Sequence, residues 1–265
     1  RKVEIGRAAF RTPVVLCGQA ARAGIACDSC HRQGRDNPDL QFPGVSGPPG
    51  TADVTSSLFS THRGNGVFDP RPIPNLSGPK AKLKVDQAPQ TARLESFIHG
   101  LVAEEFDGPE PTPATLAGLA AYVRALDPTA CPPAPREPVS VALLMADARR
   151  ALRTARETAR DGDRATAVVM VAAARARLGL IDERFSADPT LQPDRSALRA
   201  ADARLAAIQQ TLRGPRTDAH ADPAPALTAW LSQSRPLEAA LARHAPRSLF
   251  DPDHLAQAAK RRLPG

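Results

Sequence analysis

The sequence has few aromatic side chains and little methionine. Aromatic residues make up 4% of the 265 residues, Tyr122 and Trp230 are single examples of their types, and the two methionines are Met145 and Met170. Little of the apolar surface that aromatic side chains usually provide is therefore present. No apolar run approaches the roughly 18 residues that a membrane-spanning helix needs, so we expect no transmembrane segment.

Acidic residues are fewer than basic ones, 28 against 35, which gives a formal net charge of +7. Such an excess is compatible with nucleic acid, an anionic membrane surface or an acidic protein as partner. The basic residues are spread through amphipathic helical patterns and form no single block. We interpret them mainly as solvated helix faces. We expect no nucleic-acid partner and keep an acidic protein partner open.

Cysteine occurs four times, and two of the four lie in the run Cys27-Asp28-Ser29-Cys30-His31. This C-x-x-C-H pattern is the attachment signature of a c-type haem. Two thiols at this spacing can each add to a porphyrin vinyl group, and the next residue, His31, is then placed to ligate the iron. A zinc site would need a second ligand pair, and a thioredoxin-like pair would need a βαβ pattern; the sequence shows neither. The motif predicts one covalently attached haem c with His31 as proximal ligand.

A haem in the first half would supply much of the apolar surface that aromatic residues usually provide. Covalent haem attachment normally takes place outside the cytoplasm, and the sequence shows no signal peptide. We therefore expect a mature, exported chain in the periplasm, with its leader removed. In an exported protein two spare cysteines usually pair, so we predict a disulfide between Cys17 and Cys131.

A proline-rich segment, Cys131-Pro-Pro-Ala-Pro-Arg-Glu-Pro138, is typical of a stiff linker. We therefore expect a haem domain over residues 1–131, a linker over 132–138 and a second domain over 139–265. Within the haem domain the residues from Arg32 to Pro79 predict a long loop that can wrap a cofactor. Around that loop the apolar spacing predicts helices over 4–10, 20–30, 91–105 and 112–126.

The second domain is rich in alanine, arginine and leucine at helical spacing. Its pattern predicts helices over 140–160, 163–185, 193–213, 224–244 and 252–262. Short joints such as Asp161-Gly162-Asp163 favour antiparallel neighbours. The expected fold class is therefore mainly α: a cytochrome c-like haem domain followed by an antiparallel helical bundle.

Several runs of the haem domain occur in an order that resembles a known family. Glu4-Ile-Gly-Arg-Ala-Ala-Phe10, then Gly24 to His31, and further on Arg71-Pro-Ile-Pro-Asn-Leu76 resemble the amino-terminal haem domain of the di-haem cytochrome c peroxidase and MauG family. Glu105-Phe-Asp-Gly108 with the 116–126 helix resembles the closing helix shared with class I cytochromes c. The family's enzymes carry two haem motifs and this chain has one, which excludes a two-haem relay within it.

The residue on the other side of the iron has two candidates and one alternative. Where class I cytochromes place Met-Pro-x-Phe, this chain reads Ala103-Glu-Glu-Phe106, so the usual methionine ligand is absent from the haem domain. The resemblance implies His62, because the family's distal histidine also lies in a Gly-rich loop just before the segment like Arg71–Leu76. His99, near the end of a predicted helix, is the second candidate, and an open or water-bound iron is the alternative.

Other polar residues of the haem domain have weaker claims. Arg63, Arg71 and Lys80 are candidates for pairing with haem propionates, since guanidinium groups bind carboxylates bidentately. Glu104 and Glu105 can offer a carboxylate for acid–base work near the distal side, or can be ordinary polar residues at a helix end.

The second domain offers no catalytic pattern. Its histidines, His220, His244 and His254, lack metal-ligand spacing. We expect Met145 and Met170 to fill the core, and Trp230 to pack in it, with an electron-hopping role for Trp230 as the alternative.

The function that these features predict is electron transfer by a periplasmic monohaem c-type cytochrome, to or from a redox partner protein. The first alternative is a peroxidase-like or MauG-like oxidant enzyme that draws electrons from an external donor. The second alternative is a docking or structural cytochrome subunit of a larger redox complex.

Overall fold

The computed structural model describes residues 1–55, 58–77, 84–126, 138–214 and 222–262, and within them the chain is mainly helical. The chain divides into two compact units, Arg1–Ala134 and Pro135–Gly265. The predicted linker lies, except for Pro138, outside the described residues. Among the described helices, none combines the length and the apolar character that crossing a membrane requires.

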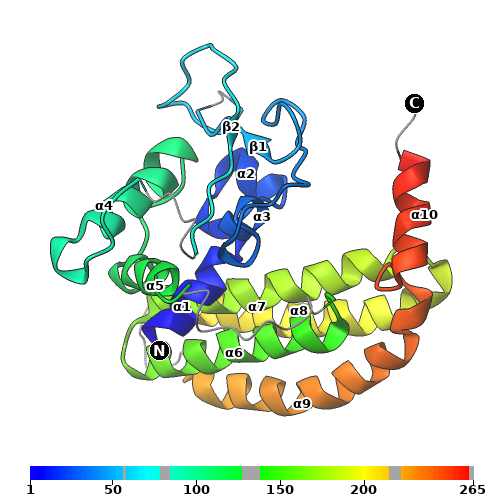
Figure 1. Cartoon of the computed structure of the whole chain (residues 1–265). Helices are drawn as coiled ribbons and strands as arrows, with labels where there is room; N and C mark the ends of the chain where they lie inside the picture. The colour runs from blue at the N-terminus through cyan, green and yellow to red at the C-terminus, as the bar shows by residue number, and fades with distance from the viewer. Residues whose placement is uncertain (56–57, 78–83, 127–137, 215–221, 263–265) are drawn as a thin grey trace. The chain divides into compact units, whose positions relative to one another are not determined.

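Unit 1 is built around a crossed pair of helices, α1 (Lys2–Phe10) and α5 (Pro113–Arg124) (Figure 1). The two helices approach closely where Gly6 and Gly118 meet, because neither residue has a side chain to keep the backbones apart. One turn further along, the rings of Phe10 and Tyr122 lie edge to face with centroids 5.2 Å apart. Thr112 caps α5 by accepting a hydrogen bond from the Thr115 amide.

The region around the C-x-x-C-H motif contains two short helices where one was predicted. Residues 20–30 form α2 (Gly18–Arg22) and α3 (Cys27–Cys30), with a break between them. The break occurs at Gly24, whose φ of +71° ends the first helix. The prediction of a single helix over residues 20–30 is therefore wrong. The second helix, α3, is one turn long and begins at the first motif cysteine, Cys27.

The long segment after the motif is loop, as predicted, with a small antiparallel ribbon of β1 (Thr51–Ala52) and β2 (Arg71–Pro72). Its apolar anchor is a row of three tilted rings, Phe42, Phe59 and Phe106, with successive centroids 5.7 and 5.8 Å apart. Short 3₁₀ turns complete unit 1 at Pro13–Val15, Arg32–Gly34 and Pro89–Thr91.

The predicted 91–105 helix consists of two consecutive segments of different helical type. It begins as α4 (Arg93–Gly100), after Ala92 in the left-handed region, and continues as a π-helical segment, Leu101–Glu105. A π-helical turn is rare and frequently marks a functional position, because the wider turn re-aims the side chains that follow. Here it buries Glu105.

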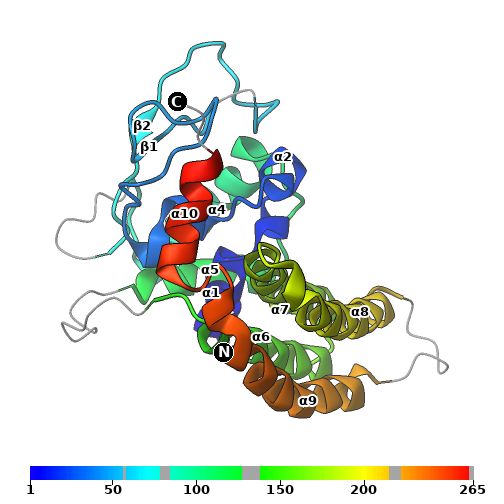
Figure 2. The ribbon, with the colours of Figure 1, turned by 90° about the vertical axis from the view of Figure 1, so that its right-hand side faces the viewer.

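Unit 2 contains four long helices that match the predicted spans closely: α6 (Val141–Arg160), α7 (Arg164–Phe185), α8 (Gln192–Arg213) and α9 (Pro223–His244). Each packs against two of the others, α6 on α7 and α9, and α8 on α7 and α9 (Figure 2). Side chains of Ser140, Asp163 and Asp222 cap three of the four amino termini. This arrangement is an antiparallel four-helix bundle.

The bundle core is aliphatic. Met145 and Met170 are fully buried in it, and Trp230 is 2% exposed, with its indole nitrogen donating a hydrogen bond to the Ala201 carbonyl at 3.0 Å. Beyond α9 the chain forms a 3₁₀ turn, Ala245–Arg247, and a final helix, α10 (Pro252–Arg262). The Phe250 ring packs on Phe185 of α7, while the described side chains of α10 are mostly exposed. A further 3₁₀ turn, Pro189–Leu191, precedes α8.

Candidate functional site

The two motif cysteines lie on one turn of helix. Cys27 and Cys30 begin and end α3, and side chains three positions apart on a helix share a face. The Ser29 hydroxyl accepts a hydrogen bond from the Ala26 amide at 3.0 Å and secures the start of the turn. The Asp28 carboxylate accepts from the Gln33 amide at 2.9 Å and secures its end. Both thiols are therefore presented side by side from a short, locally fixed element.

His31 is held by a contact from far along the chain. Its Nδ1 lies 3.0 Å from the carbonyl oxygen of Pro74. A carbonyl oxygen only accepts, so the imidazole proton is on Nδ1 and the lone pair is on Nε2. This is the arrangement that fixes the ring and the tautomer of a metal-ligating histidine. Burial lowers the pKa of His31, against smaller opposing effects of the Pro74 carbonyl and Asp28, so the neutral, ligating form is favoured.

The segment that carries Pro74 is fastened to the loop after the motif. The Leu76 amide donates to the Gly34 carbonyl at 3.0 Å, and the Ile73 amide donates to the Gly50 carbonyl at 3.1 Å. Gly34 has a φ of +79°, and a Cβ there would lie 2.5 Å from the Leu126 side chain. The backbone of the long loop thus positions the Pro74 carbonyl over His31.

The chemistry of the thiols distinguishes among the three uses of such a motif. Burial raises the pKa of Cys27 to about 12, with a smaller contribution from Cys30, and burial raises the pKa of Cys30 to about 11. A reactive dithiol requires readily formed thiolates, which burial disfavours here. Within the described residues there is also no cluster of three or more histidine, cysteine or acidic side chains that could hold a metal ion. Two half-buried thiols beside a neutral, oriented imidazole fit the donor set of a c-type haem.

His62 lies at the surface in contact with a carboxylate. Its Nδ1 is 2.8 Å from an Asp107 carboxylate oxygen, and its side chain is 64% exposed. The pairing lowers the pKa of Asp107, with a further contribution from the Thr61 amide that donates to the same carboxylate. Within the described residues, the Nε2 atom of His62 has no hydrogen-bond partner.

His99 is committed through its other nitrogen. The Nε2 atom lies 2.7 Å from a Glu110 carboxylate oxygen, and the side chain is 37% exposed. Of the two predicted distal candidates, His62 therefore has the freer Nε2, while His99 would have to exchange its carboxylate partner to ligate through that atom.

Of the three predicted propionate partners, the two arginines are engaged with carboxylates of the chain itself. Arg63 donates from Nε and Nη2 to Glu104, at 3.2 and 2.5 Å, and its Nη1 lies 3.5 Å from Glu105. Arg71 pairs with Asp69 at 2.6 Å and is 77% exposed on its side chain. Lys80 lies outside the described residues.

Glu105 is a buried acid, which its sequence position at a predicted helix end did not indicate. It is 8% exposed, and its Oε2 has no hydrogen-bond partner in the part of the chain that the structure describes. Burial raises its pKa, Arg63 and Lys84 oppose the rise, and Glu104 adds to it. The one sequence feature that points to burial is the neighbouring residue, Phe106, whose ring packs against Phe59. A buried carboxylic acid of this kind can hold and exchange a proton.

The Ser60 hydroxyl joins these groups into one cluster. It donates to the Glu104 carbonyl at 2.6 Å and accepts from the amides of His62 and Arg63 at 3.2 and 2.8 Å. The segment 58–76 is thus fastened to the π-helical turn at one end and contacts His31 through Pro74 at the other.

The sequence also names two cysteines for a predicted disulfide and three histidines of unit 2. Cys17 is exposed at the start of α2, and its predicted disulfide partner, Cys131, lies outside the described residues. In unit 2, His244 pairs with Asp194 at 2.9 Å, His254 is exposed, and His220 lies outside the described residues.

Comparison with known proteins adds no relative: no family model, no curated protein and no solved structure matches the chain. The functional assignment therefore depends on the residues of α3, on His31 and on the loop that holds it.

Proposed function

We propose that the chain is a monohaem c-type cytochrome that transfers electrons to or from a protein partner outside the cytoplasm, with unit 1 as a cytochrome c-like haem domain. The observation that carries the proposal is the hydrogen bond between His31 Nδ1 and the Pro74 carbonyl, directly after the paired thiols of Cys27 and Cys30. Two features that support haem attachment meet there: two thiols at the C-x-x-C spacing and an imidazole oriented with its Nε2 available.

Each residue has a defined part in this proposal. Cys27 and Cys30 form the thioether bonds, and His31 ligates through Nε2 while Pro74 keeps the ring in place. A haem bound in this way supplies one-electron transfer between ferric and ferrous iron. His62 is the sixth ligand that we propose, with Asp107 as the carboxylate that would orient its ring. His99 is the second choice.

A partner surface is proposed on charge. The whole chain has a formal net charge of +7, so an acidic redox partner would be attracted electrostatically. Residence in the periplasm follows from the proposed covalent attachment and is part of the same proposal.

A second function, a peroxidase-like oxidant enzyme with an external electron donor, is favoured by one observation. Glu105 is a buried acid with an unpartnered oxygen in the same unit as the haem motif. Peroxide chemistry at an open iron requires a group that moves a proton, and a buried acid of raised pKa is suited to that task.

The deciding experiment pairs haem staining after denaturing electrophoresis with optical and EPR spectra of the ferric protein. Covalent stain that is lost in Cys27→Ala/Cys30→Ala supports the attachment; stain-free wild type expressed with a haem-attachment system contradicts the whole proposal. A low-spin wild type that becomes high-spin in His62→Ala supports electron transfer with His62 as sixth ligand. A high-spin wild type that reacts rapidly with peroxide supports the second function instead.

A further inference from the structure

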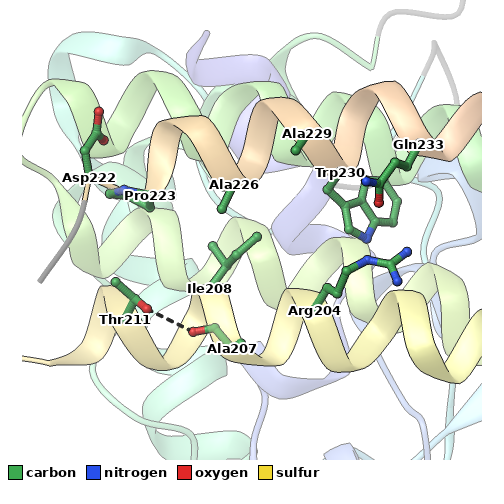
Figure 3. A pocket seen from close by; sticks show the side chains of 10 residues that line it. All are labelled: Arg204, Ala207, Ile208, Thr211, Asp222, Pro223, Ala226, Ala229, Trp230 and Gln233. Carbon is green, nitrogen blue, oxygen red and sulfur yellow. Dashed lines mark hydrogen bonds between the residues drawn. The ribbon is translucent and has the colours of Figure 1, made fainter.

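Unit 2 contains a groove between α8 and α9 that none of the haem chemistry uses. It has a volume of about 360 Å³, within the range of small-molecule sites, which in helical bundles lie between helices. Figure 3 shows how the side chains are distributed: Ile208 and Ala226 lie along the middle, Arg204, Gln233 and Trp230 gather at one end, and Asp222 lies at the other.

The walls of the groove are apolar. Ala226 and Ala229 are exposed on α9, and their small side chains leave the space open above the buried Ile208 and Trp230. The indole nitrogen of Trp230 already donates to the Ala201 carbonyl, so this polar atom of the ring is satisfied within the bundle. A hydrocarbon chain placed along these residues would remove apolar surface from water on both sides.

The two ends of the groove differ in charge. Arg204 is exposed at one end, and in the described residues it has no ion pair or hydrogen bond, whereas Arg175, Arg195 and Arg149 of the same bundle are each paired with a carboxylate. Gln233 lies beside Arg204 (Figure 3). Asp222, at the far end, is the cap of α9 and accepts from the Ala224 amide at 2.9 Å. An anionic group would therefore be attracted to the Arg204 end and repelled from the Asp222 end.

We propose that this groove binds an amphipathic organic carboxylate. Its carboxylate pairs with Arg204 and accepts from the Gln233 amide, and its hydrocarbon chain lies over Ile208 and Ala226 toward Pro223. Arg204 and Thr211 mark the two ends on α8, and seven residues of helix span about 10 Å, so a medium-length chain fits. The site belongs to unit 2 and does not depend on the proposed haem function.

The sequence provides a reporter at the site, because Trp230 is the only tryptophan of the chain. Octanoate is titrated into the full chain, and binding is followed by Trp230 fluorescence and, in parallel, by calorimetry. We expect saturable binding of octanoate, and binding of octanol and octylamine that is weaker by about tenfold or more, since a hydrogen-bonded charge pair contributes that much. Equal affinity for octanol and octanoate would contradict the carboxylate assignment. The absence of both a saturable change in Trp230 fluorescence and heat with octanoate up to millimolar concentration would contradict the site.

Two variants locate the ligand, and one serves as a control. Arg204→Gln is expected to weaken octanoate binding about tenfold while leaving octanol unaffected. Ala226→Leu, at an exposed helical position that accepts leucine, is expected to fill the groove and weaken both ligands. Arg213→Gln removes an exposed arginine of α8 outside the groove and is expected to change nothing. If Arg204→Gln and Arg213→Gln behave alike, attraction to the general positive charge explains the binding, and the proposed site is wrong.

Discussion

Gly6 on α1 and Gly118 on α5 cross so closely that a Cβ on Gly6 would lie 1.9 Å from the Gly118 carbonyl oxygen. The same Cβ would lie 2.7 Å from that of Tyr122, so the obstruction includes backbone and cannot be relieved by a side-chain rotation. This crossing brings together the first and the last described helices of unit 1. The C-x-x-C-H motif and the loop that holds His31 lie between these two helices in the sequence, so the crossing joins the two ends of the segment that contains them.

The first prediction concerns this crossing. Gly6→Ala is expected to destabilise unit 1 by about 1–3 kcal/mol, the usual cost of forcing an extra carbon into a packed contact. The free energy of unfolding is measured by urea denaturation, with the Soret absorbance of the proposed haem reporting on unit 1.

Gly179 supplies the matched control. It lies inside α7, and a Cβ there would meet no atom within 4 Å. Gly179→Ala is expected to stabilise unit 2 by about 0.5–1 kcal/mol, because alanine loses less backbone entropy in a helix. Trp230 fluorescence reports on that unit. Equal effects of the two substitutions would show that helix propensity, and not the close crossing, governs Gly6.

The second prediction tests whether His31 is the proximal ligand of the proposed haem. In His31→Ala the thioether bonds remain possible through Cys27 and Cys30, so haem stain is expected to persist on a denaturing gel while the ferric optical spectrum changes. The exposed histidine of α10 provides the control, His254→Ala, which should leave the spectrum as in the wild type. An unchanged spectrum in His31→Ala would remove His31 as the ligand.

Much of unit 2 could be predicted from the sequence because its signals are local. Ser140 and Asp163 precede apolar periodic runs and cap α6 and α7, and the joint at Gly162, with a φ of +87°, permits the tight reversal between them. Such signals depend on neighbours within a few residues, so the helix bounds follow from the pattern alone.

The site in unit 1 depends on contacts that no local pattern contains. The partner of His31 is a backbone carbonyl 43 residues away, and a carbonyl has no residue identity to recognise. Glu104 and Glu105 are identical in type and adjacent, yet the π-helical turn exposes the first and buries the second. The conformation of that turn is decided by packing around Phe106 and by Ser60, which the helical periodicity of residues 91–105 does not reveal.

The third prediction concerns a buried ion pair of the bundle. Arg149 on α6 donates to Glu238 on α9, with side chains 5% and 17% exposed. Removing one partner leaves the other charge buried without compensation, so Glu238→Ala is expected to cost about 3–5 kcal/mol of unfolding free energy. The measurement is urea denaturation followed by Trp230 fluorescence.

A double substitution separates the pair from the packing around it. Arg149→Met/Glu238→Leu replaces both charges by apolar side chains and is expected to recover most of the lost stability, since a buried pair is often no better than an apolar contact of similar size. A double variant as unstable as the single one would attribute the loss to packing.

The last prediction is the pH dependence caused by Glu105, whose pKa is raised chiefly by burial. A raised acid pKa means that the folded protein binds this proton more tightly than the unfolded chain does. Well below the usual pKa of 4.5 both states are protonated, and Glu105 does not affect stability. As the pH rises above that value the unfolded chain ionises first, so the free energy of unfolding falls until the folded carboxyl also ionises.

The substitution Glu105→Gln removes this loss of stability. We expect the stability of the variant relative to wild type to increase between pH 4 and pH 7, measured by urea denaturation at each pH. Glu104→Gln is the matched control, with measurements extended below pH 4: Arg63 lowers the pKa of Glu104, so this variant should lose stability relative to wild type as the pH rises toward the usual value of 4.5, and its relative stability should change little above about pH 5. Parallel pH profiles for the two variants would contradict the opposite environments of these adjacent carboxylates.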